Sequence, residues 1–409
     1  MEKKTKKSKK NRRWIRPRHT VIRHVIYWPF RIYSRLVYGI RIENYPKDAP
    51  HPCLILYNHQ TPFDQFFVGL SFPKHVYYVA SEDLFSNSWL SRLLSWAVAP
   101  IPFRKSTSDL TAIKNCLRIA REGGTIAMAP EGNRTYSGTT EHIKAGVASL
   151  AKALGLPIAI FRIEGGYGAC PRWSDTVRKG RMRGYYSRIV LPEEYASMSK
   201  EELFDLLQQE LYVDERLDPT PFYTKRPAEY LDRAMYYCPT CGLTKFHSEG
   251  DTITCRTCGL AARYLPDKRL EAVAGPFPYP YVKEWYDAQC AYVRGLDMAA
   301  FGDKPLCEDT VCLQDNLYCQ KKVVLDKAAT LRLYSDRFTL TAGGTEMLLP
   351  FETVSSATVL GRNKFNIYYE GRILQCKGDK HFNALKYLNL YFHAIHKEQE
   401  TGEPAFLGL

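Results

Sequence analysis

The chain has 409 residues, of which 45% are hydrophobic and 24% are charged. These proportions exclude a wholly disordered chain, and the length excludes a small domain held together by disulfide bonds. A chain of this size has room for two or three domains with sizeable cores. The formal net charge of +14 is the unusual property, and it predicts a polyanionic partner, either nucleic acid or an acidic membrane surface.

The basic residues are concentrated at the N-terminus. One acid, Glu2, accompanies a run of basic residues that comprises Lys3, Lys4, Lys6, Lys7, Lys9, Lys10, Arg12, Arg13, Arg16 and Arg18. The following stretch, Val21 to Ile42, repeats a basic or aromatic residue every four positions, at Arg23, Tyr27, Arg31 and Arg35. This pattern predicts a basic amphipathic helix with a kink at Pro29.

The arginines make this helix a poor transmembrane span and a poor signal peptide. Residues 1–45 are therefore expected to lie on an anionic membrane surface, with the helix in the plane of the headgroups. The alternative is an ordinary core-packing helix behind a solvated tail.

Residues 46–220 alternate between predicted strands and predicted helices. Apolar runs of strand length occupy residues 53–57, 76–80, 125–129, 158–163 and 187–191. Helical spacing of apolar residues predicts one helix that follows Ser108 and ends at Gly123, and another that runs from Ile143 to Gly155. This alternation predicts an α/β domain with a central, largely parallel sheet. Functional residues in such domains gather where strands end and helices begin.

A histidine and an aspartate follow the first of these strands. On a continuous helix His59 and Asp64 would point about 140° apart, because each residue turns the helix by about 100°. Thr61 and Pro62 predict a helix start between them, with Thr61 as the N-cap, which lets the two side chains meet. Asp64 would then fix the tautomer of His59, and the other ring nitrogen would be a general base for a hydroxyl. Taken alone, such a spacing also arises by chance.

A second polar loop follows the strand at residues 125–129. It reads Pro130-Glu-Gly-Asn-Arg134, in which the glycine permits close backbone approach and the arginine can grip a phosphate with two hydrogen bonds. Upstream, Arg104 and Lys105 place two more cations after a short apolar run. In isolation, basic residues of this kind are usually solvated surface charges.

Taken in order, these residues resemble the motifs of the glycerolipid acyltransferase family, whose best-known member is lysophosphatidic acid acyltransferase. The first motif, N-H-x-x-x-x-D, is met by Asn58, His59 and Asp64. The third, usually P-E-G-T-R-S, is met by Pro130, Glu131, Gly132 and Arg134, with Asn133 and Thr135 in place of the usual Thr and Ser. The second motif normally ends in Asp-Arg, whereas this chain has Arg104-Lys105. The resemblance covers residues 52–191.

The resemblance implies an O-acyltransferase that moves a fatty acyl group from acyl-CoA or acyl-carrier protein to the free hydroxyl of a lysophospholipid. The favoured acceptor is 1-acyl-sn-glycerol 3-phosphate, and glycerol 3-phosphate or an aminolipid stays open. A thioester is electrophilic enough for direct attack by an alcohol, so a base, a phosphate site and a stabilised oxyanion suffice. His59 would be the base and Asp64 would hold its ring. The implied substrate-binding residues are Asn58, Arg104, Lys105, Glu131, Gly132 and Arg134.

Four of the twelve cysteines form two C-x-x-C-G units. They are Cys238, Cys241, Cys255 and Cys258, with thirteen residues between the second and the third. This spacing predicts a zinc ribbon over residues 228–270, in which a closed four-thiolate site has a structural role. A disulfide or redox pair is the alternative, and His247 is expected at the surface rather than on the metal. The other cysteines are scattered and, without a visible signal peptide, predict reduced thiols in a cytosolic setting.

Residues 300–398 are expected to form a small antiparallel β-barrel or sheet. Alternating segments with turn signals occupy residues 330–341, 346–351, 364–369 and 372–377. A helix with one apolar face, from Leu385 to Ile395, follows them. The arrangement resembles a pleckstrin-homology-type barrel closed by a C-terminal helix. One more helix is expected over residues 282–294.

Two other classes of function compete with the enzyme. A basic arm with a zinc ribbon also fits a nucleic-acid-binding protein, but the ribbon's own loop is poor in cations, which disfavours nucleic acid as the partner. A membrane-binding adaptor with an inactive acyltransferase domain is the third interpretation, and the intact His59, Asp64, Glu131 and Arg134 argue against it. The expected location is the cytoplasmic face of the cell membrane, where the protein would be peripheral or monotopic.

Overall fold

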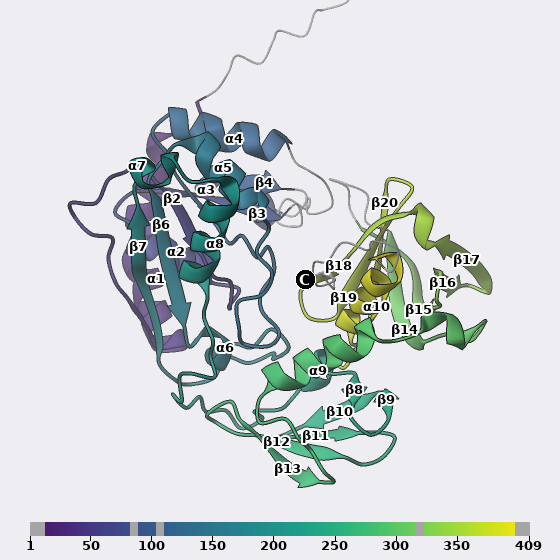
Figure 1. Cartoon of the computed structure of the whole chain (residues 1–409). Coiled ribbons are helices and arrows are strands. Elements are labelled where there is room, and N and C mark those ends of the chain that lie inside the picture. Colours follow the sequence, from purple (N-terminus) through teal and green to yellow (C-terminus); the bar gives the residue numbers. More distant parts are fainter. Residues whose placement is uncertain (1–12, 82–88, 104–109, 316–321, 397–409) are drawn as a thin grey trace, which may run out of the picture.

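The computed structural model describes residues 13–81, 89–103, 110–315 and 322–396 (Figure 1). Three groups of strands and helices follow one another along the chain. A mixed sheet with its helices lies on the left of Figure 1, a small antiparallel sheet at the bottom, and a larger antiparallel sheet on the right.

The first sheet is largely parallel, as predicted. Its strands are β1 (Ile40–Ile42), β2 (Leu54–Tyr57), β3 (Val76–Ser81), β4 (Ile101–Phe103), β5 (Thr125–Met128), β6 (Ile158–Glu164) and β7 (Met182–Val190). They lie in the order β1-β7-β6-β2-β5-β3-β4. The pair β6–β7 is antiparallel, and the other pairs are parallel.

Helices cover both faces of this sheet. They are α1 (Pro17–Tyr33), α2 (Asp64–Ser71), α3 (Trp89–Val98), α4 (Leu110–Arg121), α5 (Gly146–Leu154), α6 (Gly166–Ala169), α7 (Pro192–Ala196) and α8 (Lys200–Leu211). Leu54 and Leu56 of β2 point into a core formed with α4, α5 and α8. Ile55 and Tyr57 point to the opposite face, where α2 packs. Burial on both faces explains why the strands read as unbroken apolar runs.

The N-terminal helix ends earlier than predicted. It continues through Pro29, passes into a π-helical turn at Ser34–Tyr38 and stops at Gly39. Gly39 has φ +64°, and a Cβ there would lie 2.1 Å from the carbonyl oxygen of Gly180. Only glycine fits so close an approach, so the chain leaves the helix there, and Ile40–Ile42 forms strand β1 beside β7.

Part of the predicted basic stripe of α1 faces the protein. Arg23 donates to the Phe72 carbonyl, and Arg31 donates to the carbonyls of Leu70 at 3.5 Å and Ile42 at 3.2 Å. Two of these carbonyls lie at the C-terminal end of α2, which attracts positive charge. The outward side of α1 is instead an apolar stripe, 55% to 79% exposed, of Val21, Val25, Trp28, Ile32 and Leu36. No helix in the described ranges is both long enough and apolar enough to cross a bilayer.

The second half of the chain begins with two small antiparallel sheets. A short 3-10 helix, Leu231–Arg233, precedes them. The strands β8 (Tyr237–Cys238) and β9 (Gly242–Leu243) pair with each other. A four-stranded sheet follows, made of β10 (Phe246–Glu249), β11 (Thr252–Cys255), β12 (Ala261–Tyr264) and β13 (Leu270–Ala274). Helix α9 (Val282–Arg294) comes next and has the predicted bounds.

A seven-stranded antiparallel sheet and a helix complete the described chain. The strands are β14 (Cys307–Asp315), β15 (Val323–Leu333), β16 (Arg337–Ala342), β17 (Thr345–Pro350), β18 (Val354–Leu360), β19 (Lys364–Tyr369) and β20 (Arg372–Lys377). Their order is β17-β16-β15-β14-β20-β19-β18, and α10 (Ala384–His396) packs against β18 and β19. The segment expected as one unit at residues 330–341 is two strands, because a turn at residues 334–336 separates β15 from β16. The pleckstrin-homology-type resemblance stays a prediction.

The cysteine-rich part and the C-terminal sheet share one hydrophobic core. This core contains Phe246 of β10, Trp285 of α9 and Phe338 of β16. Tyr136 and Trp173, from the first half of the chain, belong to the same core. The predicted boundaries at residues 228–270 and 300–398 therefore do not correspond to separate cores.

Candidate functional site

Two loops meet at the carboxyl edge of the first sheet. Strands β2 and β5 are parallel neighbours, with Leu56 opposite Met128, and each ends just before one of the predicted motifs. The amide of Thr135, in the second loop, donates to the His59 carbonyl in the first at 3.1 Å. The structure thus brings together two motifs that are about seventy residues apart in the sequence.

His59 and Asp64 are in contact. His59 Nδ1 lies 2.8 Å from Asp64 Oδ2, and since a carboxylate only accepts, Nδ1 carries the proton and Nε2 is the basic nitrogen of the neutral ring. Asp64 is 0% exposed but fully bonded. Its oxygens also accept the amides of Gln60 and Thr61 at 2.7 and 2.9 Å and the Thr61 hydroxyl at 2.6 Å.

The helix start between the two residues differs from the prediction. Helix α2 begins at Asp64, and Phe63 occupies the N-cap position, where Thr61 was expected. The carboxylate of Asp64 takes the amides of the preceding turn, so that residues 60–63 wrap around it before the helix begins. The turn still serves the predicted purpose, because it directs the ring of His59 onto Asp64 and leaves the side chain 22% exposed.

Glu131 and Asn58 make contacts within the protein. Glu131 is 2% exposed, and its oxygens accept the amides of His59 at 2.7 Å and Glu141 at 3.0 Å. Burial raises the pKa of Glu131 to about 8, against the opposing effect of these amides. The Asn58 amide group bonds the backbone of Ile163 at 2.7 and 2.8 Å, which ties the end of β2 to β6. These contacts fix both side chains within the protein, and the predicted part of Asn58 and Glu131 in substrate binding stays a prediction.

In the second loop, Gly132 has open space beside it, and Arg134 has a guanidinium nitrogen without an acceptor among the described residues. Gly132 is exposed, has φ +69°, and would place a Cβ no closer than 4.0 Å to Lys144 Cε. Arg134 has a buried Nη1 without a hydrogen-bond partner in the described part of the chain. Burial and the nearby Arg172 lower the pKa of the Arg134 guanidinium. A buried guanidinium nitrogen without an acceptor is costly, so this position favours an anion.

Arg134 belongs to an arginine cluster, which we define as Arg134, Arg172 and Arg362. Arg172 is 4% exposed and donates to the Arg134 carbonyl at 2.9 Å and to the β18 backbone at 3.5 Å. Arg362 follows β18 and lies 3.2 Å from Asp175, which Arg233 contacts at 2.7 Å. Arg362 is also among the charges that lower the pKa of Arg134. The C-terminal sheet therefore adds positive charge to the edge where His59 lies.

Sequence reasoning missed Arg172 and Arg362. Neither lies in a motif of the resembling family, and Arg362 lies in a turn of the C-terminal sheet that no periodicity connects with the first sheet. The predicted cations Arg104 and Lys105, and the predicted cap Ser108, lie outside the described residues.

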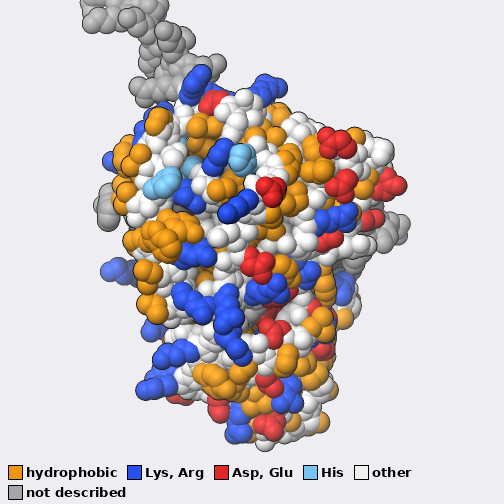
Figure 2. Space-filling model, turned by 90° about the vertical axis from the view of Figure 1, so that its left-hand side faces the viewer, with side chains coloured by type: hydrophobic (Ala, Val, Ile, Leu, Met, Phe, Trp, Pro, Cys, Tyr) orange, Lys and Arg blue, Asp and Glu red, His pale blue; other side chains and the backbone are white. Residues whose placement is uncertain are grey.

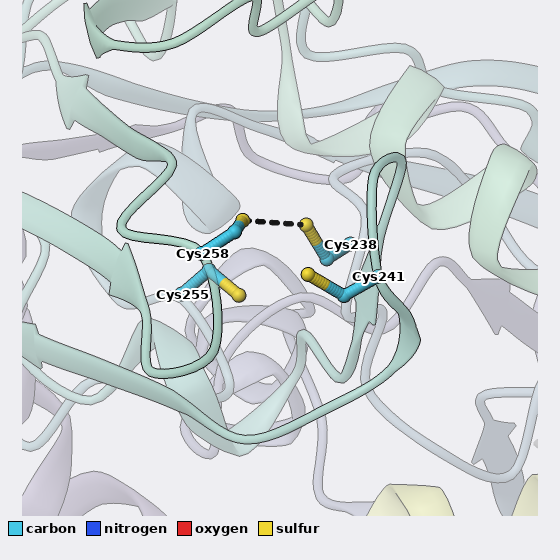
Figure 3. Close-up of side chains that lie close together, drawn as sticks. All are labelled: Cys238, Cys241, Cys255 and Cys258. Carbon is cyan, nitrogen blue, oxygen red and sulfur yellow. Dashed lines mark hydrogen bonds between the residues drawn. The ribbon is translucent and has the colours of Figure 1, made fainter.

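The four predicted metal-binding cysteines converge (Figure 3). Cys238 and Cys241 flank the β8–β9 turn. Cys255 is the last residue of β11, and Cys258 lies in the turn that follows. The sulfurs of Cys238 and Cys258 are 3.7 Å apart, and all four lie within 4.8 Å of one another. A tetrahedral zinc ion with Zn–S bonds of about 2.3 Å separates its sulfurs by about 3.8 Å. The sulfur positions therefore fit a zinc ion.

The backbone favours the thiolate form of Cys255, whereas burial raises the pKa of Cys238. Gly242 and Gly259, which follow the two pairs, have φ of +74° and +76°, where glycine is strongly preferred. Burial raises the pKa of Cys255, but hydrogen bonds from the amides of Cys258 and Thr257 outweigh it and lower the pKa to about 7. A thiolate is the form that binds metal.

Residues 39–163 match the model of the family described as Acyltransferase. Two relatives carry the name 1-acyl-sn-glycerol-3-phosphate acyltransferase. The chloroplastic protein of Brassica napus is 23% identical over 141 residues, which are 33% of this chain and 39% of the relative. The Bacillus subtilis protein is 23% identical over 170 residues, which are 40% of this chain and 81% of the relative. The crystal structure of the 1-acyl-sn-glycerophosphate acyltransferase PlsC from Thermotoga maritima is similar at 21% identity and a TM-score of 0.40, covering 47% of this chain and 78% of that one.

This chain thus spans about two fifths of the length of the Brassica napus relative. The matched segment contains both loops at the carboxyl edge, with His59, Asp64, Glu131 and Arg134. The family match and the names of the relatives together support an acyltransferase of the glycerolipid type.

Proposed function

We propose that this protein transfers a fatty acyl group from a thioester donor, acyl-CoA or acyl-carrier protein, to the free hydroxyl of 1-acyl-sn-glycerol 3-phosphate. The observation that carries the proposal is the His59–Asp64 pair beside the arginine cluster. A base for a hydroxyl and a site for a phosphate on one sheet edge are the two elements that an acyl transfer to a phosphorylated glycerol requires.

His59 supplies the proton transfer. Its Nε2 takes the proton of the acceptor hydroxyl as the new C–O bond forms, and Asp64 stabilises the imidazolium through Nδ1. The C–S bond of the thioester then breaks, and the imidazolium returns the proton to the leaving thiolate. No acyl-enzyme is required, since the alcohol attacks the thioester directly.

The arginine cluster holds the acceptor phosphate. The unpartnered Nη1 of Arg134 and the guanidinium of Arg362 offer charge-assisted hydrogen bonds of the kind that phosphate accepts in pairs. Arg104 and Lys105 remain proposed contributors from outside the described residues. Gly132, with an open Cβ position, lets the acceptor approach the backbone of the second loop.

An acyl-transfer assay with purified protein tests the proposal. The assay uses 1-acyl-sn-glycerol 3-phosphate, glycerol 3-phosphate and an aminolipid as acceptors, each with acyl-CoA and with acyl-carrier protein. We expect His59→Ala to lower turnover by about 10²- to 10⁴-fold, the usual contribution of a general base, while the exposed His51→Ala retains it. Full activity of His59→Ala would contradict the mechanism, and turnover of glycerol 3-phosphate alone would reassign the acceptor.

We also propose that the outward face of α1 lies on an anionic membrane surface, on the cytoplasmic side. The apolar stripe of α1 continues onto α3, where Leu93 and Trp96 are 46% and 52% exposed, and Arg18 lies over the Trp96 ring at 5.2 Å. Figure 2 shows hydrophobic and basic side chains side by side on the left of this face, with few acidic ones. Apolar and basic residues together are what interfacial binding requires.

Flotation with liposomes tests the membrane proposal. Wild-type protein is expected to float with vesicles that contain phosphatidylglycerol, and Trp28→Glu with Ile32→Glu is expected to lose most of this binding. The pair Leu217→Glu and Tyr223→Glu, at exposed positions outside α1 and α3, is the control. Binding to DNA or RNA with unchanged flotation of the first pair would favour the nucleic-acid interpretation.

A further inference from the structure

A second cluster of metal-binding side chains lies between the cysteine-rich part and the C-terminal sheet. Asp232 belongs to the 3-10 helix Leu231–Arg233, His247 to β10, and His381 to the loop between β20 and α10. One nitrogen of each ring and one oxygen of the carboxylate all lie within 4.8 Å of one another. This cluster shares no residue with the four cysteines, so its donor atoms belong to a distinct position.

Polar atoms of this cluster lack partners. Asp232 is 3% exposed, and its Oδ2 accepts the Ser248 amide at 3.0 Å and His381 Nδ1 at 2.7 Å. Its Oδ1 is buried and has no hydrogen-bond partner in the described residues, and the same holds for Nδ1 of His247. Burying a carboxylate oxygen that receives no hydrogen bond destabilises the folded protein. A buried imidazole nitrogen without a hydrogen-bond partner adds to this cost. One ligand that accepts electron pairs from both atoms would remove both deficits.

The neighbouring Lys245 and Lys386 form their ion pairs with Asp309 and not with Asp232. A cavity of about 250 Å³ adjoins the cluster and is lined by Asp232, His381, Lys245 and Lys386 among others. Both lysines instead contact Asp309, at 2.8 and 3.0 Å. His381 is therefore the one ionisable hydrogen-bond partner of the Asp232 carboxylate in the described chain.

We propose that Asp232, His247 and His381 bind a second divalent transition-metal ion, with Zn²⁺ the best match to the donor set. Imidazole nitrogens and a carboxylate oxygen are its usual ligands outside thiolate sites. Three protein ligands leave positions for water, and the rings of His247 and His381 lie beside each other with centroids 5.0 Å apart. The ion joins a segment before the cysteine-rich sheet, a strand of that sheet and the loop that leads into α10, so it fastens these three elements together.

The discriminating variant is His247→Ala. His247 takes no part in the Asp232–His381 hydrogen bond. Its Nε2 lies 3.7 Å from Oε2 of the exposed Glu249. A simple Asp232–His381 pair would be unaffected by its removal, whereas a metal site would lose a ligand. The exposed His51→Ala is the matched control for surface histidine binding.

The experiment is a calorimetric titration of untagged, full-length protein with Zn²⁺, after elemental analysis has established how much metal the cysteine site retains. We expect wild type and His51→Ala to take up one further equivalent, His247→Ala to bind it at least about 10-fold more weakly, and His381→Ala to lose it. Added Zn²⁺ should raise the thermal midpoint of wild type and not that of His247→Ala. No further equivalent in wild type, or equal uptake by His247→Ala, would overturn the proposal. If His381→Ala does not fold, the His247→Ala result still decides.

Discussion

The two predicted sites of this protein are built in opposite ways. At the carboxyl edge of the first sheet, Asp64 is surrounded by donors while Arg134 retains a buried nitrogen without an acceptor. At the cysteine site, four sulfurs lie close together, and neighbouring amides favour the thiolate form of Cys255. In the functions proposed above, a substrate would complete the first site and one zinc ion would complete the second.

This contrast teaches what to expect from each site. A closed four-thiolate site has no open position for a substrate, so its ion would contribute to folding. If the proposed function holds, the surplus positive charge at the edge of the first sheet would be offset only when an anionic substrate binds. Substitutions at the cysteines should therefore change stability and zinc content, whereas substitutions at the sheet edge should change activity.

The largest effect is expected at the cysteines. Cys238→Ser with Cys241→Ser should abolish zinc binding at the cysteine site and unfold the second half of the chain, because structural zinc contributes on the order of 10 kcal/mol in isolated zinc-finger peptides. The shared core should carry the loss from the cysteine-rich sheet to the C-terminal sheet. Elemental analysis and thermal unfolding measure both effects. Cys312→Ser, outside the site, is the control, and a double variant with the same zinc content as wild type would refute the four-thiolate site.

The next effect is expected at Asp64. Asp64→Asn replaces the carboxylate by an amide, which cannot accept all the hydrogen bonds from His59, Gln60 and Thr61. The tautomer and the orientation of the His59 ring should then no longer be fixed. We expect turnover to fall by about 10²- to 10⁴-fold, with the zinc content unchanged. Steady-state kinetics measure this loss, with the exposed Asp205→Asn as the control. If Asp64→Asn turned over substrate at the wild-type rate, His59 would not be the base.

A smaller effect is expected at Arg362. Arg362→Gln should raise the KM for the phosphorylated acceptor about tenfold and leave kcat nearly unchanged, since one hydrogen bond to a charged group is worth about 1.5 kcal/mol. Arg337→Gln, which removes a comparable arginine paired with Asp336 on the same sheet, should leave the KM unchanged. An equal change in both variants would show that the C-terminal sheet acts on the whole fold rather than on the phosphate. Titration of the acceptor at saturating donor separates these outcomes.

The smallest effect is expected from pH at the α1 contact. His19 is 1% exposed and bonds Tyr77 at 3.0 Å, and burial, with the neighbouring His75 and Arg18, lowers its pKa from 6.5 to about 4. The unfolded chain therefore binds more protons between these values, so the stabilising contribution is complete above pH 6.5 and is lost as the pH falls towards 4.

Denaturant unfolding of wild type and His19→Gln between pH 4 and pH 7 isolates this contribution, because loss of zinc at low pH is common to both proteins. The stability of wild type should fall more steeply than that of the variant. Parallel curves would show that His19 does not titrate in this range.

Much of the first sheet could be predicted from the sequence, because strands buried on both faces leave unbroken apolar runs and glycines end the helices between them. The residues at which helices begin and end were harder to predict from the sequence. The end of α1 at Gly39 depends on a close approach to Gly180, and the start of α2 depends on the carboxylate of Asp64 drawing in the turn before it. The first cause acts between distant residues, whereas the second acts within four residues, through contacts that a cap predicted at Thr61 did not reveal.

The sequence by itself determined which side chains lie at each site: a histidine with an aspartate, a loop with a glycine and an arginine, and four cysteines at the spacing typical of a zinc ribbon. Local propensity and spacing suffice for these, since each motif is contained in one short turn. The tertiary structure alone decided which groups face one another. It turned Arg23 and Arg31 inward and the apolar stripe of α1 outward, brought Arg362 to the edge that holds His59, and placed Asp232, His247 and His381 together. These are contacts between segments distant in the chain, and their energies exist only once the cores have formed.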